Sequence, residues 1–370
     1  MIKRKAIAIC LLFTATSFVT AAEGPKKARE ALASARATKE ADQKLKAYLG
    51  LKDDAVTDEA DVRAVYDEFG NLESDFSKKE KARMERASEH LAKVLASCQA
   101  PKYRSLIREL VEKENAGLGS GYWGPWAAKS EADLMRETPR YARLQAVLEA
   151  SGKGGNEEAL PALRSMRKKG GQAGKMAETA IGRIGKDEDL DSFVAEIKSN
   201  PRSLVSLYGF GRKGFARVSK ELTAPTVSAE EKVRLAGALP TSVSHDDLPA
   251  AMALLKHPDP RVVSVAARTV ANSLTPADDA LLRELLKSKD QAVRGPAILS
   301  IDRNWDPKYI PDLIEVLRKD PDDGNRSAVA HMLGARKAKA AEVDLRAVAK
   351  DDQVPWVREA AQEALNVLSK

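Results

Sequence analysis

The chain has little of what marks cross-linked or strand-rich proteins. Its 370 residues include two cysteines, and aromatic residues make up 5% of the total. If Cys10 leaves with an N-terminal leader, Cys98 is the only thiol, and no disulfide can form within the chain. Runs of β-branched residues are short, whereas Ala, Leu, Lys, Arg and Glu are abundant. This composition favours an all-helical chain that relies on a large apolar core.

Long apolar runs are absent except at the start of the chain. Lys3, Arg4 and Lys5 precede an apolar stretch at 6–19, and small residues follow at 20–22. This order is typical of a secretory signal peptide, and the run is too short to span a bilayer comfortably. We expect a signal peptide at 1–22, no membrane span after its cleavage, and a secreted protein of the bacterial periplasm. An uncleaved membrane anchor is the alternative.

Neither sign of charge is in strong excess. The chain has 61 basic and 54 acidic residues, a net charge of +7. Removal of the predicted leader takes away three basic residues and leaves a net charge of +4. Proteins that bind nucleic acid in general have a larger basic excess or a clear basic stripe. We therefore expect no nucleic-acid partner.

Familiar catalytic and metal-binding patterns are missing as well. None of the four histidines is spaced as H-x-x-x-H or H-E-x-x-H, the spacings that place two ligands on one helix face. No G-x-S-x-G, P-loop or G-x-G-x-x-G pattern opens a helix after a strand. We expect no catalytic residue, no metal and no cofactor. A carboxylate pair assembled from distant segments stays open at this stage.

What the chain does have is an internal repeat of about 31 residues, a period that together with helical patterning indicates a solenoid. The clearest copies begin at Glu230, Asp259, Asp290 and Pro355. Each copy reads as a first helix with the pattern V-R-x-x-A and a second helix with one apolar stripe. One helix pair cannot bury such a stripe, but stacked pairs can. In register, one position holds Arg234, Arg294, Arg326 and Arg358.

A glycine-rich break at 151–155 separates this array from what precedes it. We therefore expect an N-terminal helical region at 23–150, in which Pro139 begins a helix, and an α-solenoid of stacked helix pairs at 151–370.

The motif D-x-x-V-R-x-x-A, read from Asp290 to Ala297, resembles that of the HEAT-like repeats. The resemblance is to the short type of about 30 residues that is also found in phycobilin lyases. The sequence departs from the motif at Val263, where Arg is expected, and at Asn325, where Val is expected. The resemblance implies a fold that holds other molecules, and it implies ladders in which an Arg bridges to an acid or carbonyl of the next repeat.

These ladders give the repeated polar residues a structural interpretation. Asp290 and Asp322 are placed to cap helix N-termini. Arg294, Arg326 and Arg358 recur on one face and are interpreted as the structural ladder. The alternative is that this row of arginines binds an anion or an acidic partner.

Two irregular segments are candidate binding sites. The loop at 117–126 carries Tyr122, Trp123 and Trp126 among glycines and a proline. Aromatic side chains on such a loop can stack on sugar rings or on a proline-rich peptide. Alternatively, they pack over the N-terminal edge of the solenoid.

The second segment, 208–217, mixes aromatic residues and glycines with Arg212, Lys213 and Arg217. These three cations can contact an anionic ligand on the solenoid surface. The alternative is that the segment is a degenerate repeat turn.

The leading functional hypothesis is a non-catalytic, secreted scaffold that binds another protein through its concave surface. The alternatives are a carbohydrate or cell-wall binding module that uses the loop around Trp123, and an enzyme related to HEAT-like lyases or glycosylases. The polar positions expected on the concave surface are Arg283, Lys287, Glu315, Arg318 and Arg346.

Overall fold

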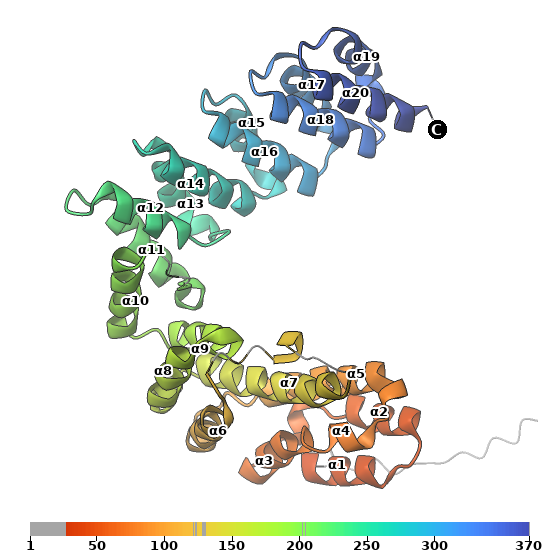
Figure 1. Cartoon of the computed structure of the whole chain (residues 1–370), viewed down its shortest axis with the longest axis vertical. Helices are drawn as coiled ribbons and strands as arrows, with labels where there is room; N and C mark the ends of the chain where they lie inside the picture. The colour runs from red at the N-terminus through yellow and green to blue at the C-terminus, as the bar shows by residue number, and fades with distance from the viewer. Residues whose placement is uncertain are drawn as a thin grey trace, which may run out of the picture. The chain divides into compact units, whose positions relative to one another are not determined.

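The computed structural model describes residues 27–369 except 121, 123, 128–130, 202 and 204. The predicted signal peptide and Trp123 therefore lie outside the described residues. Within the described part, twenty α-helices are joined by turns and short 3₁₀ helices, with no strand (Figure 1). The predicted all-α helical-repeat solenoid is confirmed. None of the described helices combines the length and the apolar content that a membrane span requires.

The described residues divide into two compact units. The first takes its residues from Met1–Cys98 and Lys129–Arg143, and the second from Gln99–Ala128 and Leu144–Lys370. Both this division at Arg143 and the boundary expected at 151 fall inside one helix, α7 (Glu131–Lys153). Pro139 lies inside α7 and does not begin a helix, so that prediction was wrong.

The first unit is built around a buried polar network. The Tyr48 hydroxyl lies 2.7 Å from Oε1 of Glu68 and also contacts Asp75. Arg36 donates to Glu68 from Nε at 2.6 Å, and Lys44 donates to Asp75 at 2.7 Å, so each carboxylate has a cation. Burial, and after it the hydrogen bonds from the Tyr48 hydroxyl to Asp75 and Glu68, raise the pKa of Tyr48. The helices of this unit are α1 (Ala28–Ala37), α2 (Ala41–Leu49), α3 (Glu59–Glu68), α4 (Leu72–Asp75), α5 (Lys81–Ala96) and the first part of α7.

The second unit carries the repeats. Its helices before the clear repeats are α6 (Arg104–Gly117), the rest of α7, α8 (Leu160–Lys169), α9 (Gly171–Ile184), α10 (Asp187–Ser199) and α11 (Gly211–Thr223). The repeat helices are α12 (Ala229–Gly237), α13 (Leu248–Ala253), α14 (Pro260–Ser273), α15 (Asp279–Leu286), α16 (Gln291–Arg303), α17 (Ile310–Lys319), α18 (Asp323–Ala335), α19 (Glu342–Asp351) and α20 (Pro355–Leu368).

Apolar stripes and small residues hold the successive repeats together. Leu313 and Leu317 on α17 are fully buried, and α17 packs on α18 (Figure 1). On α18, a Cβ added at Gly334 would lie 2.6 Å from Cα of Ala364 on α20. Only a glycine at 334 allows the backbones of these two first helices to approach so closely.

Asp290 and Asp322 cap the N-termini of their first helices, α16 and α18, as predicted. The Asp290 carboxylate accepts the backbone N–H of Ala292 at 2.8 Å, and Asp322 accepts that of Asn325 at 2.8 Å. Such caps satisfy N–H groups that have no partner inside the helix.

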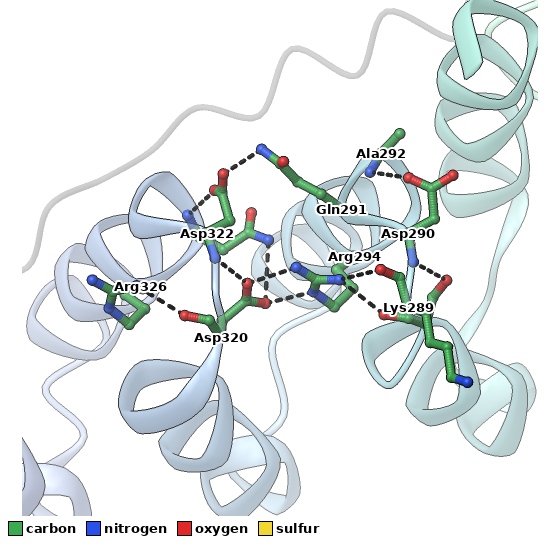
Figure 2. Close-up of polar contacts among 10 residues, drawn as sticks. Lys289, Asp290, Gln291, Ala292, Arg294, Asp320, Asp322 and Arg326 are labelled. Atoms are coloured by element: carbon green, nitrogen blue, oxygen red, sulfur yellow. Dashed lines mark hydrogen bonds and ion pairs between the residues drawn. The ribbon is translucent and has the colours of Figure 1, made fainter.

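The repeated arginines bridge one repeat to the next (Figure 2). Arg294 on α16 donates from Nε and Nη2 to both oxygens of Asp320, at 2.7 and 2.8 Å, and Arg326 on α18 pairs with Asp352 in the same way at 2.8 and 2.9 Å. Arg358 on α20 donates to the Asp352 carbonyl at 2.6 Å. We call the two bidentate pairs the Arg–Asp ladder.

The ladder carboxylates also organise the helix starts. Oδ1 of Asp320 accepts the N–H of Asp322, the N-cap residue of α18, at 2.9 Å. Burial works to raise the pKa of Asp320, but the hydrogen bonds from Arg294 and Asp322 outweigh it, so the pKa lies below its usual value. The hydrogen bond from Arg326 likewise lowers the pKa of Asp352.

Candidate binding groove around Tyr208

The regular repeat fails just before α11, and an aromatic side chain is exposed there. Tyr208 and Phe210 lie in one short 3₁₀ helix, η6 (Tyr208–Phe210). Phe210 is 5% exposed and packs edge-on against Phe193 of α10, with ring centroids 5.4 Å apart. Tyr208 is 68% exposed. One turn of backbone therefore fixes one ring in the core and leaves the other to solvent.

Two glycines set the position of this turn. A Cβ added at Gly209 would lie 2.3 Å from the carbonyl oxygen of Thr179 on α9. A Cβ added at Gly182, also on α9, would lie 2.7 Å from Cα of Gly209. The backbones of η6 and α9 therefore touch directly, which only glycine permits at both positions. This contact fixes where the backbone carries Tyr208.

Tyr208 lines two hollows, and we call them together the Tyr208 groove. One has a volume of about 250 Å³ and the other of about 530 Å³. The smaller is lined largely by apolar side chains, including Leu207, Phe215, Pro240 and Val243. The larger includes Ile197, Ser206, Arg234, Leu239 and Thr241. Tyr208, Ala238 and Pro240 line both hollows, so the hollows adjoin.

The cations singled out in this segment are all paired within the chain. Arg212, Lys213 and Arg217 lie on the first turns of α11, and each has a carboxylate within 3.1 Å. The pairs are Arg212 with Asp247, Lys213 with Asp187 and Arg217 with Glu221. An anionic ligand would have to displace these carboxylates. Tyr208 lies in the same sequence segment as these cations, but no local pattern singles it out.

The aromatic loop lies elsewhere in the second unit. The Tyr122 carbonyl accepts the N–H of Gln172 at 2.7 Å, close to the N-terminus of α9. Trp126 lies in a short 3₁₀ helix, η4 (Gly124–Ala127), and its side chain, like all of Trp123, lies outside what the structure describes. The glycan-binding role of this loop stays a prediction.

Two of the polar residues expected on the concave surface form ion pairs between second helices. Arg283 on α15 pairs with Asp312 on α17, and Arg318 on α17 pairs with Asp344 on α19 at 2.6 Å. Arg346 pairs with Glu342 on its own helix at 2.6 Å. Lys287 and Glu315 line a hollow of about 430 Å³ beside the ladder residue Arg294. Two of the five expected concave residues, Arg283 and Arg318, therefore join successive repeats.

The described residues contain no group of three or more His, Cys, Asp and Glu side chains that can hold a metal ion. Cys98 is buried, and this burial raises the pKa of its thiol to about 12. The thiol is therefore not a thiolate near neutral pH, which is the form that reacts.

The C-terminal repeats match a known family. Residues 279–366 match the model described as HEAT repeats. This segment is a HEAT-like repeat array. The chain has no match among the curated proteins. HEAT repeats are commonly scaffolds for protein interactions, and the Tyr208 groove lies before the matched residues.

Proposed function

We propose that this protein is a secreted, non-catalytic scaffold that binds another protein at the Tyr208 groove. The observation that carries the proposal is that Tyr208, 68% exposed, lines two adjoining hollows of about 250 and 530 Å³. Tyrosine is enriched at interface positions that dominate binding, because its ring buries a large area while its hydroxyl keeps a polar contact. The HEAT-like segment supports the same class of function.

The groove is a better candidate than the concave residues expected from the sequence. Arg283 and Arg318 already pair with Asp312 and Asp344, so a partner would have to compete with these contacts. In the Tyr208 groove, by contrast, apolar side chains such as Leu207 and Phe215 line a hollow. Covering an apolar hollow removes its surface from water, which favours binding.

Site-specific photo-crosslinking tests the proposal. The full-length chain with a benzophenone amino acid at Tyr208 is expressed in its native host, and the control carries the same group at Val343. Val343 lies on α19 and is 74% exposed, so it matches Tyr208 in accessibility but not in surroundings. We expect a discrete protein adduct from position 208 alone. Adducts of equal yield at both positions, or recovery of a small ligand and no protein, would contradict the proposal.

Secretion is tested separately by fractionation and by N-terminal sequencing of the mature protein. We expect the protein in the envelope or extracellular fraction with a new N-terminus near residue 23. A cytosolic chain that keeps its first residues would refute the secreted part of the proposal and leave the binding part standing.

A further inference from the structure

The junction between α14 and α16 lacks both charged members of the Arg–Asp ladder. Val263 stands at the register position of the ladder arginines. Ser288 stands two residues before the N-cap of α16, the place that the ladder acids Asp320 and Asp352 take before α18 and α20. The Ser288 hydroxyl accepts the N–H of Asp290 at 3.2 Å, so the start of α16 keeps this hydrogen bond without a negative charge at 288. The loop that joins α15 to α16 therefore differs in charge from the loops that follow it.

This loop also carries two exposed lysines, Lys287 and Lys289. Within the described part of the chain, neither ammonium has a carboxylate within 4.0 Å. Lysine recurs three residues before the N-caps of α14 and α18, but one residue before them the array has Pro258 and Pro321 where this loop has Lys289. The Lys289 side chain points away from the ladder in Figure 2. The loop therefore presents two cations that are free to pair with an acid from another molecule.

Both lysines line the hollow of about 430 Å³ described above. Leu286 and Val316, which are 5% and 7% exposed, form part of the same lining. An apolar side chain that enters here covers this surface and removes it from water, which favours binding. No residue of this hollow lines the Tyr208 groove, so the two surfaces are distinct.

The carboxylates that line this hollow are paired with cations of the chain. The pairs are Asp312 with Arg283, Glu315 with Lys319 and Asp320 with Arg294. A polyanion with a charge on every unit, such as a nucleic acid, would bring some of its charges against these three carboxylates. A peptide with two acidic residues and an apolar residue between them fits the surface better, because its two charges can lie at the two lysines.

We propose that this hollow binds an acidic segment of a partner protein, with carboxylates at Lys287 and Lys289 and an apolar side chain in the hollow. A lysine at a helix C-terminus also offsets the helix dipole, a role that suits Lys287 at the C-cap of α15. Lys289 lies two residues beyond that C-cap, so the dipole does not explain it. The inference goes beyond the binding proposed at the Tyr208 groove and does not depend on it.

Short peptides with both ends blocked test the proposal on the full-length protein. The probes are Gly-Glu-Leu-Glu-Gly and its uncharged match Gly-Gln-Leu-Gln-Gly, with inorganic tripolyphosphate as a compact polyanion. Binding is followed by titration calorimetry and by NMR of the lysine side chains. The test variant carries Lys287→Gln and Lys289→Gln, and Lys256→Gln is the matched control. Lys256 is exposed and stands at the same position before its N-cap as Lys287, but it does not line the hollow.

We expect the Glu peptide to bind about 2- to 30-fold more tightly than the Gln peptide, because each of two exposed ion pairs multiplies the affinity by about 1.4 to 5.4. This preference should decrease as salt is added, since salt screens exposed charges. It should vanish in the double Gln variant and remain in Lys256→Gln. Replacing Lys287 and Lys289 by arginine, which keeps both charges, should also keep the preference.

Three outcomes would overturn the inference, and they differ from one another. Equal binding of the two peptides, or equal loss of the preference in Lys256→Gln, means that the hollow does not select an acidic segment. A double Gln variant that loses thermal stability but keeps the preference means that the lysines act on the helix end alone. Tripolyphosphate that binds more tightly than the Glu peptide, and only with both lysines present, would replace the protein segment by a phosphate ligand. None of these outcomes affects the crosslinking at Tyr208, which tests the proposed function separately.

Discussion

Replacing Asp320 by alanine should weaken the junction between two repeats more than any exposed substitution. The Asp320 side chain is 1% exposed and that of its partner Arg294 is 7% exposed. Asp320→Ala leaves the guanidinium buried without its carboxylate, and it also removes the acceptor for the N–H of Asp322. Breaking a buried pair in this way typically costs about 3–5 kcal/mol. For a protein with a total stability of about 5–15 kcal/mol, this is a large fraction.

The loss should be local, because each repeat of a solenoid contacts only its neighbours. Hydrogen exchange followed by mass spectrometry is therefore the right assay. We expect the protection of buried α18 amides, such as Val329 and Leu333, to fall by about 150- to 4,000-fold, as 3–5 kcal/mol implies. Helices of the first unit should exchange as in the wild type.

Two variants make the reasoning refutable. Glu342→Ala removes an ion pair whose side chains are 68% and 42% exposed, and it should cost less than about 0.5 kcal/mol. The double variant Arg294→Met, Asp320→Asn keeps an acceptor for Asp322 and removes both buried charges, so it should be much more stable than Asp320→Ala. If Asp320→Ala costs no more than Glu342→Ala, the ladder does not join the repeats as we argue.

Three further predictions follow from burial and close contact. Folding lowers the pKa values of Asp320 and Asp352, so their contribution to stability is complete above the unfolded-state pKa of about 3.9 and is lost as the pH falls through the lower folded-state values. The free energy of unfolding of Asp320→Asn should therefore fall less steeply with decreasing pH than that of the wild type. An unchanged slope would count against this. Cys98 should resist maleimide in the native protein and react after denaturation, as judged by mass spectrometry; rapid native labelling would contradict its burial and raised pKa. Gly209→Ala should lower the melting temperature and weaken binding at the groove, because its Cβ meets the carbonyl of Thr179. Gly117→Ala should do neither, because Gly117 has open space around it and does not line the groove.

The repeat array was predictable because its sequence pattern also determines which residues contact one another. Arg294 and Asp290 recur at a fixed spacing, and a residue that recurs at this spacing contacts its counterparts in adjacent repeats. The cap at Asp290 follows from local chemistry alone, and the structure places it as expected. The extent of α7 was not predictable in the same way, since a proline such as Pro139 reads as a helix start when the neighbouring contacts are unknown.

The Tyr208 groove depends on contacts that no local pattern encodes. The exposure of Tyr208 results from the approach of Gly209 to Gly182, two residues far apart in the sequence. Arg234 donates to the backbone carbonyl of Lys198 rather than to a ladder carboxylate, and the sequence carries a signal of this, because His257 stands two residues before the N-cap of α14, where Asp320 and Asp352 stand before α18 and α20. This signal can be read only once it is known that the ladder arginine pairs with the residue two places before the N-cap of the next first helix. The structure shows that pairing at Asp320 and Asp352.

The glycine contact between η6 and α9 fixes the position of the groove independently of the side chain that recognises the partner. The backbone is held at Gly182 and Gly209, and the side chain at position 208 takes no part in that contact. Position 208 can therefore change its side chain while the turn stays in place. A substitution at position 208, in evolution or by design, can therefore alter the specificity of this surface while the packing of the repeats stays unchanged.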